Sequence, residues 1–156
     1  MGQKTNVMRI LDSLKLPYLS HAYPAPSAVS GVEVAGLLGQ DPSHVFKTLV
    51  TVGASKKYYV FVIPVAQELS LKKAAAAVGE KSIEMLKSKE LLPLTGYVHG
   101  GCSPIGMKKT FPTVVDETVL LCDTVMFSAG KIGFQVEMKP EDLKLVVDYS
   151  VAAVTA

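Results

Sequence analysis

Charge, cysteine and long apolar runs are all scarce in this chain, and each shortage excludes a class of protein. Charged residues make up 19% of the 156 residues and the formal net charge is +2, which is too small to announce nucleic-acid binding by itself, so we expect no DNA partner. No uncharged apolar stretch approaches the roughly 20 residues that cross a bilayer, and the amino-terminal segment lacks a signal-peptide core. We therefore expect a cytoplasmic protein with no membrane partner.

The cysteines give no sign of a metal site. Cys102 and Cys122 form no C-x-x-C pair, and neither lies close in sequence to His21 or His44. This spacing argues against zinc and fits reduced thiols in the cytosol. We expect neither a metal nor another cofactor.

What the sequence does contain is an apolar composition of ordinary length. Hydrophobic residues make up 49%, without a repeat, a linker or a low-complexity tract. A chain of this size buries one substantial core. We therefore expect a single domain over residues 1–156.

Periodicity and capping residues predict several helices and a sheet. The predicted helices cover residues 5–15, 30–39, 70–78 and 88–92, and a last one begins at Pro140. The predicted strands cover residues 45–52, 58–65, 97–99, 113–116, 118–121, 124–127 and 134–138. Helices and strands do not alternate regularly, so we predict an α+β fold with a mixed, mainly antiparallel and curled sheet flanked by helices.

The most informative segment is the loop at residues 100–106, Gly-Gly-Cys-Ser-Pro-Ile-Gly. Glycine allows the backbone to approach a ligand and adopt positive φ, and proline stiffens the turn. The loop can therefore present a row of N–H donors to a carbonyl or phosphate oxygen. The alternative is a tight connection between two strands, which is the commoner use of Gly and Pro.

Lys47 is the second informative feature, because it places a cation on an apolar strand face. The strand period of two puts Lys47 on the same face as Val45 and Leu49. It can be an edge-strand lysine whose ammonium reaches water. Alternatively it lies at the mouth of a pocket, where it attracts an anionic backbone or polarises a carbonyl.

Two familiar motifs are excluded by spacing. The Gly130-Lys131 pair follows a strand, as in a P-loop. A P-loop, however, has four residues between its first glycine and the Gly-Lys-Ser/Thr and continues as a helix, whereas residues 132–136 are strand-like. We predict a hairpin turn there, with Ser128 at its base. The loop around Ser103 is one residue too long for a nucleophile elbow and opens no helix. This disfavours a covalent mechanism at Ser103 or Cys102, and Cys102 is expected to be a small apolar filler.

Six short segments together resemble the YbaK family of Cys-tRNA(Pro) deacylases. They occur in the family's order over nearly the whole chain: residues 21–23, 45–49, 71–73, 95–97, 100–109 and 128–131. The family is related to the editing domain of bacterial prolyl-tRNA synthetases, which implies a barrel-like mixed sheet flanked by helices. The implied activity is metal-free hydrolysis, in trans, of the ester between a wrong amino acid and its tRNA, without an enzyme nucleophile. Prolyl-tRNA synthetase is the implied protein partner.

The resemblance also implies roles for particular residues. Lys47 matches the functional lysine, and Gly101 matches a backbone donor near the ester. The implied substrate-binding residues are Tyr23, Ser30, Thr48, Ser128 and Gln135. The basic residues expected around the pocket mouth, as tRNA contacts, are Lys108, Lys109 and Lys131.

The sequence departs from the family pattern at three positions, and the departures at Ser30 and Gln135 leave the preferred amino acid open. Some members have an aromatic residue at Ser30, an aspartate or serine at Gln135, and commonly an aliphatic residue at Cys102. Alanine, serine or proline esters therefore compete with cysteine. A non-catalytic module that binds aminoacyl-tRNA or a synthetase is the alternative to an enzyme, and a covalent esterase is the third class. Small amino acids are hard to discriminate by binding alone, which is why a second hydrolytic site is useful.

Overall fold

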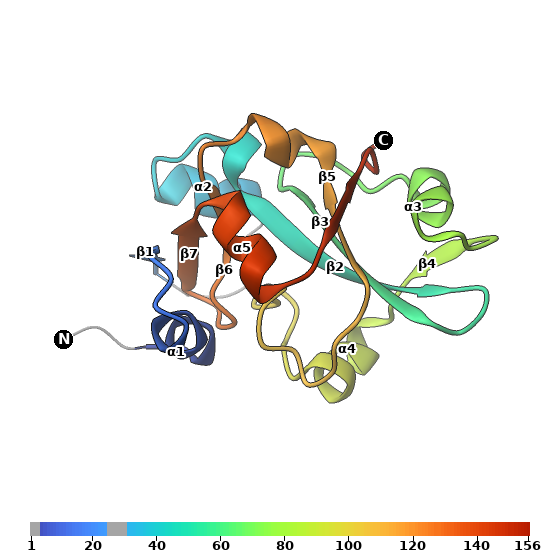
Figure 1. Cartoon of the computed structure of the whole chain (residues 1–156), viewed down its shortest axis with the longest axis horizontal. Coiled ribbons are helices and arrows are strands. Elements are labelled where there is room, and N and C mark those ends of the chain that lie inside the picture. Colours follow the sequence, from blue (N-terminus) through green and yellow to red (C-terminus); the bar gives the residue numbers. More distant parts are fainter. Residues whose placement is uncertain (1–3, 25–30) are drawn as a thin grey trace.

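The computed structural model describes residues 4–24 and 31–156 (Figure 1). Five α-helices, two short 3-10 helices and eight strands lie within these ranges. In chain order the elements are α1 (Asn6–Ser13), β1 (Leu19–Ala22), α2 (Gly31–Leu37), η1 (Pro42–His44), β2 (Phe46–Gly53), β3 (Tyr58–Pro64), α3 (Leu71–Val78), β4 (Ile83–Met85), α4 (Ser88–Thr95), β5 (Thr113–Asp116), η2 (Glu117–Leu121), β6 (Val125–Ser128), β7 (Phe134–Met138), α5 (Pro140–Val146) and β8 (Ser150–Ala152).

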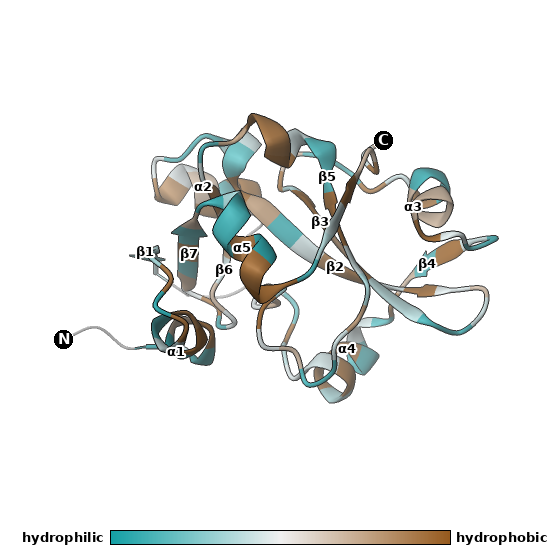
Figure 2. Cartoon of the chain, viewed as in Figure 1, coloured by the Kyte–Doolittle hydropathy of each residue, from teal (hydrophilic) through white to brown (hydrophobic). Residues whose placement is uncertain are grey.

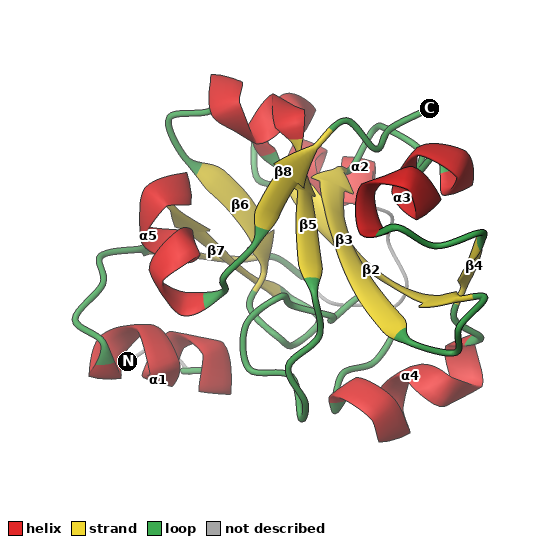
Figure 3. Ribbon diagram, turned by 45° about the vertical axis from the view of Figure 1, so that its right-hand side comes forward, coloured by secondary structure: helices red, strands yellow, loops and turns green. Residues whose placement is uncertain are grey.

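The strands form two sheets. The larger has the order β4-β2-β3-β5-β8 and the smaller has the order β1-β7-β6, and Figure 3 shows β2, β3, β5 and β8 side by side. The pairs β3–β5 and β5–β8 are parallel, whereas the other four pairs are antiparallel. The α+β class and the mixed, mainly antiparallel pairing are thus confirmed. The described strands do not close into a barrel, because the backbones of the two sheets pair only at a parallel bridge between Val45 and Met126.

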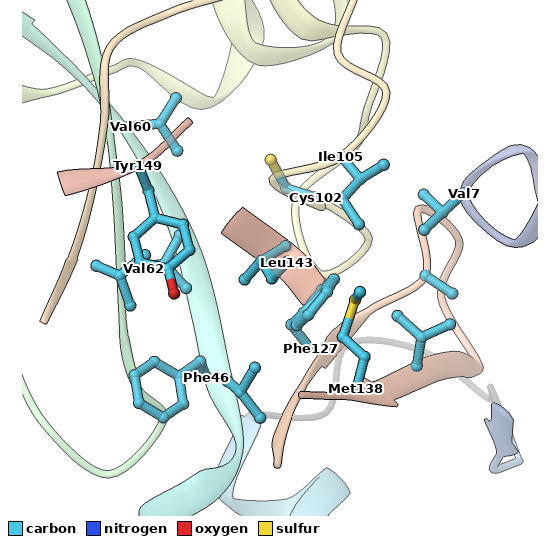
Figure 4. Close-up of a cluster of buried hydrophobic side chains, with 14 of the residues drawn as sticks. Val7, Phe46, Val60, Val62, Cys102, Ile105, Phe127, Met138, Leu143 and Tyr149 are labelled. Carbon is cyan, nitrogen blue, oxygen red and sulfur yellow. The ribbon is translucent and has the colours of Figure 1, made fainter. Parts of the chain in front are cut away.

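The main core fills the space between the two sheets (Figure 4). Phe46 and Val62 contribute from the larger sheet, and Phe127 and Met138 from the smaller one. Val7 of α1, Leu143 of α5 and Ile105 of the glycine-rich loop complete this cluster. A second cluster lies on the other face of the larger sheet, where Ala74 and Ala75 of α3 pack with Phe61 and Ile63. Figure 2 shows that β2 and β3 are largely apolar and that a hydrophilic stretch interrupts the apolar residues of β2.

Local signals in the sequence account for most of the helix ends. The Thr5 side chain accepts from the Met8 N–H at the start of α1, and the Ser70 side chain accepts from the Lys73 N–H at the start of α3. Gly79 ends α3 in the left-handed region at φ 74°. The helix predicted over residues 88–92 continues to Thr95. The predicted cap at Ser30 lies outside the described residues.

Two predicted strands are wrong. Residues 118–121 belong to the 3-10 helix η2, because the Asp116 carboxylate accepts from the Thr118 N–H and turns the chain. Leu120 and Leu121 are consequently 74% and 87% exposed rather than buried in a sheet. Residues 97–99 form a loop between Gly96 and Gly100, which both adopt φ 87°. The strands β1, β4 and β8 have three or four residues each and were not predicted.

None of the described helices is long and apolar enough to span a membrane.

The Asp116 carboxylate generates a stability prediction. It is 1% exposed and accepts hydrogen bonds from the N–H and hydroxyl of Thr118 and from the Val154 N–H, which ties β5 to η2 and to the carboxyl-terminal segment. We expect Asp116→Ala to lower the free energy of unfolding by about 2–4 kcal/mol, since it leaves buried donors unpaired. Urea unfolding measures this change. The matched control is Asp123→Ala at an exposed site, expected to change stability by no more than about 0.5 kcal/mol, and equal effects of the two substitutions would contradict the assignment.

Candidate active site

A cavity of about 290 Å³ opens where the two sheets meet. Its walls come from β2, from the facing residues of β6 and β7, from the glycine-rich loop and from the segment that joins β4 to α4. The lining residues are Tyr23, Val34, Val45, Phe46, Lys47, Thr48, Leu49, Val50, Val65, Met85, Leu86, Ser88, Leu91, His99, Gly100, Cys102, Ser128 and Gln135. Five of the predicted site residues are therefore brought together in one place: Tyr23, Lys47, Thr48, Ser128 and Gln135.

The cavity has a buried end and an open end. Tyr23, Ser128 and Gln135 are each less than a tenth exposed and form the buried end. Met85 is 45% exposed, and Ser88 and His99 are also exposed, so the β4–α4 segment and residue 99 form the open end. Val45, directly before β2, bridges Met126 of β6, and Thr51 of β2 pairs with Met85 of β4, which places Lys47 and Thr48 between these two contacts.

Two buried oxygens in this cavity lack a hydrogen-bond partner among the described residues. They are the Thr48 Oγ1 and the Gln135 Oε1. The Gln135 side chain is held in β7, directly opposite Ser128 of β6 and His21 of β1. An unsatisfied buried acceptor costs about 1–3 kcal/mol. Two such atoms that line one cavity indicate a place built for a ligand with hydrogen-bond donors.

The Lys47 side chain is half-buried and lines the same cavity as Thr48 and Gln135. The pairing register places it opposite Ile63, on the face of β2 that carries Val45 and Leu49, as the strand period predicted. No carboxylate of the described residues lies within ion-pair distance of its ammonium. A half-buried cation without a counter-ion attracts an anionic or strongly polarised group.

Ser128 and Tyr23 have backbone contacts that fix their positions. The Ser128 Oγ accepts from the Gly130 N–H at 3.1 Å, which closes the turn after β6 and leaves the hydroxyl proton available. The Tyr23 N–H donates to the Gly133 carbonyl at 2.9 Å. The turn over residues 128–133 therefore positions both side chains at the buried end. Ser30 lies outside the described residues.

Gly101 lies differently from the prediction. Its N–H donates to the Val98 carbonyl oxygen at 3.0 Å, and Gly101 does not line the cavity. The need for glycine is steric, because a Cβ at residue 101 would lie 3.1 Å from the Ile132 backbone nitrogen. The neighbouring residues Gly100 and Cys102 line the cavity instead.

The two candidate nucleophiles of the loop are held in a hydrogen bond or kept protonated. The Ser103 hydroxyl is fully buried and accepts from the Ile105 N–H. Burial raises the pKa of the Cys102 thiol to about 12, which keeps it protonated at physiological pH. The described residues contain no group of three or more His, Cys, Asp or Glu side chains arranged to hold a metal ion.

The three predicted tRNA-contact lysines are exposed and lie outside the cavity lining. The Lys108 side chain lies over Gly96. The Lys131 ammonium lies 5.6 Å from the centre of the Phe134 ring. The open-end residues Met85, Leu86, Ser88 and Leu91 were missed, because no sequence pattern marks a three-residue strand and the helix after it as part of a site. His99 was considered only as part of a nucleophilic hydrolase, which the sequence disfavours.

Comparison with known proteins assigns a family to this arrangement. Residues 25–145 match the model of the aminoacyl-tRNA editing domain, and the chain belongs to that family. The chain is 45% identical to the Enterococcus faecalis protein EbsC, over 98% of this chain and 94% of the relative, and EbsC carries the name of a Cys-tRNA(Pro)/Cys-tRNA(Cys) deacylase.

Two further similarities extend this result. A proline–tRNA ligase of Shouchella clausii is 28% identical over 70% of this chain, which corresponds to 19% of the ligase. A crystal structure described as a trans-editing enzyme for prolyl-tRNA synthetase superposes with a TM-score of 0.83, at 24% identity and 99% coverage of both chains. This structure supports the fold.

The raised pKa of Cys102 predicts slow alkylation. At pH 8 a thiol with a pKa of about 12 is ionised to about one part in ten thousand. We expect iodoacetamide to modify Cys102 at least about 1,000-fold more slowly in the folded chain than in urea, because the thiolate is the nucleophile. Peptide mass spectrometry over time measures both rates. Rapid modification of Cys102 in the folded chain would identify an activated thiol and contradict the assignment.

Proposed function

We propose that this chain is a trans-editing deacylase that hydrolyses mischarged tRNA, with Cys-tRNA(Pro) as the preferred substrate. The observation that carries the proposal is that the residues of the two unpartnered buried oxygens, Thr48 and Gln135, line one cavity together with the half-buried Lys47. An aminoacyl ester brings an α-ammonium group that donates hydrogen bonds and a carbonyl that a cation polarises. The family assignment and the name of the Enterococcus relative support the same reaction.

The proposed roles follow from position in the cavity. Tyr23, Ser128 and Gln135 hold the amino-acid side chain and ammonium at the buried end, and Thr48 and Lys47 lie beside the ester. Ser30 is retained as a proposed pocket residue on the resemblance alone. The nucleoside end of the substrate then reaches the open end, and Lys108, Lys109 and Lys131 attract the tRNA backbone. Such contacts weaken as salt is added.

An activated ester needs little catalytic machinery. In the proposed mechanism the substrate thiol sulfur bonds to the ester carbonyl carbon, the ester C–O bond breaks, and the thiol proton passes to the leaving ribose oxygen. Water then opens the resulting thiolactone to release cysteine. The site contributes orientation and stabilisation of the developing oxyanion. We propose that no metal takes part.

The engaged loop residues disfavour the covalent-esterase alternative. Ser103 is buried and accepts within its own turn, and the Cys102 thiol is held protonated. The non-catalytic binding module remains the second candidate, because the same cavity would hold an aminoacyl end without turnover. We also propose a working association with prolyl-tRNA synthetase, on the similarity to part of the Shouchella ligase, and a cytoplasmic location, where aminoacyl-tRNA is used.

A panel of mischarged tRNAs tests the activity and the amino acid together. We expect rapid deacylation of Cys-tRNA(Pro) and much slower deacylation of the alanyl and seryl esters, since only cysteine supplies a thiol. Adding EDTA should leave the rate unchanged. The rates are measured by release of labelled amino acid. Turnover restored only by zinc would refute the metal-free mechanism, fast hydrolysis of Ala-tRNA would indicate water attack, and no turnover of any ester would favour the binding module.

Lys47 provides a second test. Lys47→Met keeps the aliphatic stem and removes the charge, so we expect it to lower kcat/KM about 100-fold or more while the fold stays cooperative. Lys47→Ala should lose a similar amount. The matched control is Lys57→Met in the exposed turn between β2 and β3, expected to keep parental activity. Parental activity in Lys47→Met would show that this lysine is an edge residue that merely reaches solvent.

A further inference from the structure

The backbone of β2 has an open edge at Thr48. On one side β2 pairs with β3 along its whole length. On the other side β4 pairs only with residues 51–53, and the bridge to β6 involves Val45. The Leu86 N–H donates to the Val50 carbonyl at 3.1 Å and marks the end of the β4 contact. The outer edge of Thr48, opposite its pairing with Val62 of β3, therefore lies in a gap between the two sheets where no described strand pairs with it.

The direction of the Thr48 backbone groups follows from the hydrogen bonds of its neighbours. The Val65 N–H donates to the Val45 carbonyl, and the Gly53 N–H donates to the Lys57 carbonyl, so residues 45 and 53 face β3. Backbone groups alternate along an antiparallel strand. Residues 46, 48 and 50 therefore face the opposite edge, and the Val50 carbonyl bond to Leu86 agrees with this phase. The Thr48 N–H and C=O therefore both point away from β3, in the plane of the sheet, toward the open edge of β2.

This outward edge borders the cavity. Thr48 lines the cavity, and its own Oγ1 is one of the two unpartnered acceptors. A residue in extended conformation presents its N–H and C=O on one side as a donor and acceptor pair. An α-aminoacyl ester in extended conformation has the complementary pair, with an ammonium N–H and an ester carbonyl. Two such residues exchange two hydrogen bonds, as opposed residues do in an antiparallel sheet.

We propose that the aminoacyl group binds as a one-residue strand on the open edge of β2. The Thr48 N–H donates to the ester carbonyl oxygen, and the Thr48 carbonyl accepts from the α-ammonium group. This inference rests on the proposed deacylase function. It assigns the main-chain donor to the ester at Thr48, since the Gly101 N–H is taken by Val98. Such a donor stabilises the developing oxyanion without any side chain.

The arrangement also has a stereochemical consequence. Side chains of directly opposed residues lie on the same face of a sheet. The side chain of an L-amino acid held on this edge lies on the face of Thr48, which is also the face of Phe46 and Val50 at the main core. A D-amino acid places its side chain toward the face of Lys47 and Leu49. The edge therefore selects the L configuration of the amino acid, and the residues around the cavity limit the size of its side chain.

Replacing one backbone atom tests the proposal. Position 48 is exchanged for α-hydroxyisovaleric acid by nonsense suppression, and the matched control is Thr48→Val. The two variants share one side-chain shape and differ only in N–H against O. We expect kcat/KM for Cys-tRNA(Pro) to be about 100-fold lower in the ester variant than in Thr48→Val. We expect only a small decrease in unfolding temperature, since this N–H has no partner in the described chain and the ester only weakens the Lys47 carbonyl as an acceptor toward β3. Equal kcat/KM values would overturn the proposal and leave the deacylase function standing.

A stable ligand decides the proposal even without turnover. The probe is cysteine joined by an amide to 3′-amino-3′-deoxyadenosine, added to the ¹⁵N-labelled chain. We expect a downfield shift of the Thr48 amide proton, and at least about tenfold weaker binding of both the analogue without the amino group and the D-cysteine analogue. Binding that leaves the Thr48 amide proton unchanged, or no binding, would overturn the proposal. A chain that hydrolyses no mischarged tRNA but shifts this proton on binding would refute the deacylase function alone.

Discussion

The structure depends on how little backbone pairing joins the two sheets. A single bridge between Val45 and Met126 joins them, and the ladder between β2 and β4 begins six residues beyond Val45, at Thr51. Between these points one edge of β2 is left without a neighbour. The cavity, the open Thr48 backbone and the position of Lys47 all result from this interval. A continuous ladder would pair the edge and fill the same space with main chain.

The glycine-rich loop lines the cavity with Gly100 and Cys102 and supports it with its other residues. Gly101 packs against the backbone at Ile132, so the loop and the turn that carries Ser128 hold each other in place. The Tyr97 hydroxyl donates to the Ile105 carbonyl and folds the loop onto the core. Burial raises the pKa of this hydroxyl to about 12. Gly101 and Ser103 are therefore engaged in contacts within the fold, and the loop lines the cavity with Gly100 and Cys102.

Much of this arrangement was readable from the sequence because its signals are local. The β2–β3 hairpin, the Ser70 cap and the β6–β7 pair have clear periodicity or capping residues, and each appears where predicted. The motif resemblance assigned Lys47, Thr48 and Gln135 to one site from the sequence alone. The missed parts are non-local: β1, β4 and β8 are short strands that exist because of their partners, and Met85 reaches the cavity only through the pairing of β4 with β2. Residues 118–121 have strand-forming side chains, but one carboxylate hydrogen bond at Asp116 decides their conformation.

Because the cavity lies between the two sheets, ligand binding in it is linked to the stability of the fold. A molecule in the cavity contacts β2 of one sheet and β6 and β7 of the other, so it joins two sheets that are otherwise connected by the main core and by a single backbone bridge. Whatever binds the folded state alone stabilises it by RT ln(1 + [L]/Kd). Ligand binding therefore adds directly to the cohesion between the two sheets. The melting temperature of the folded chain becomes a sensitive indicator of which aminoacyl groups the cavity accepts.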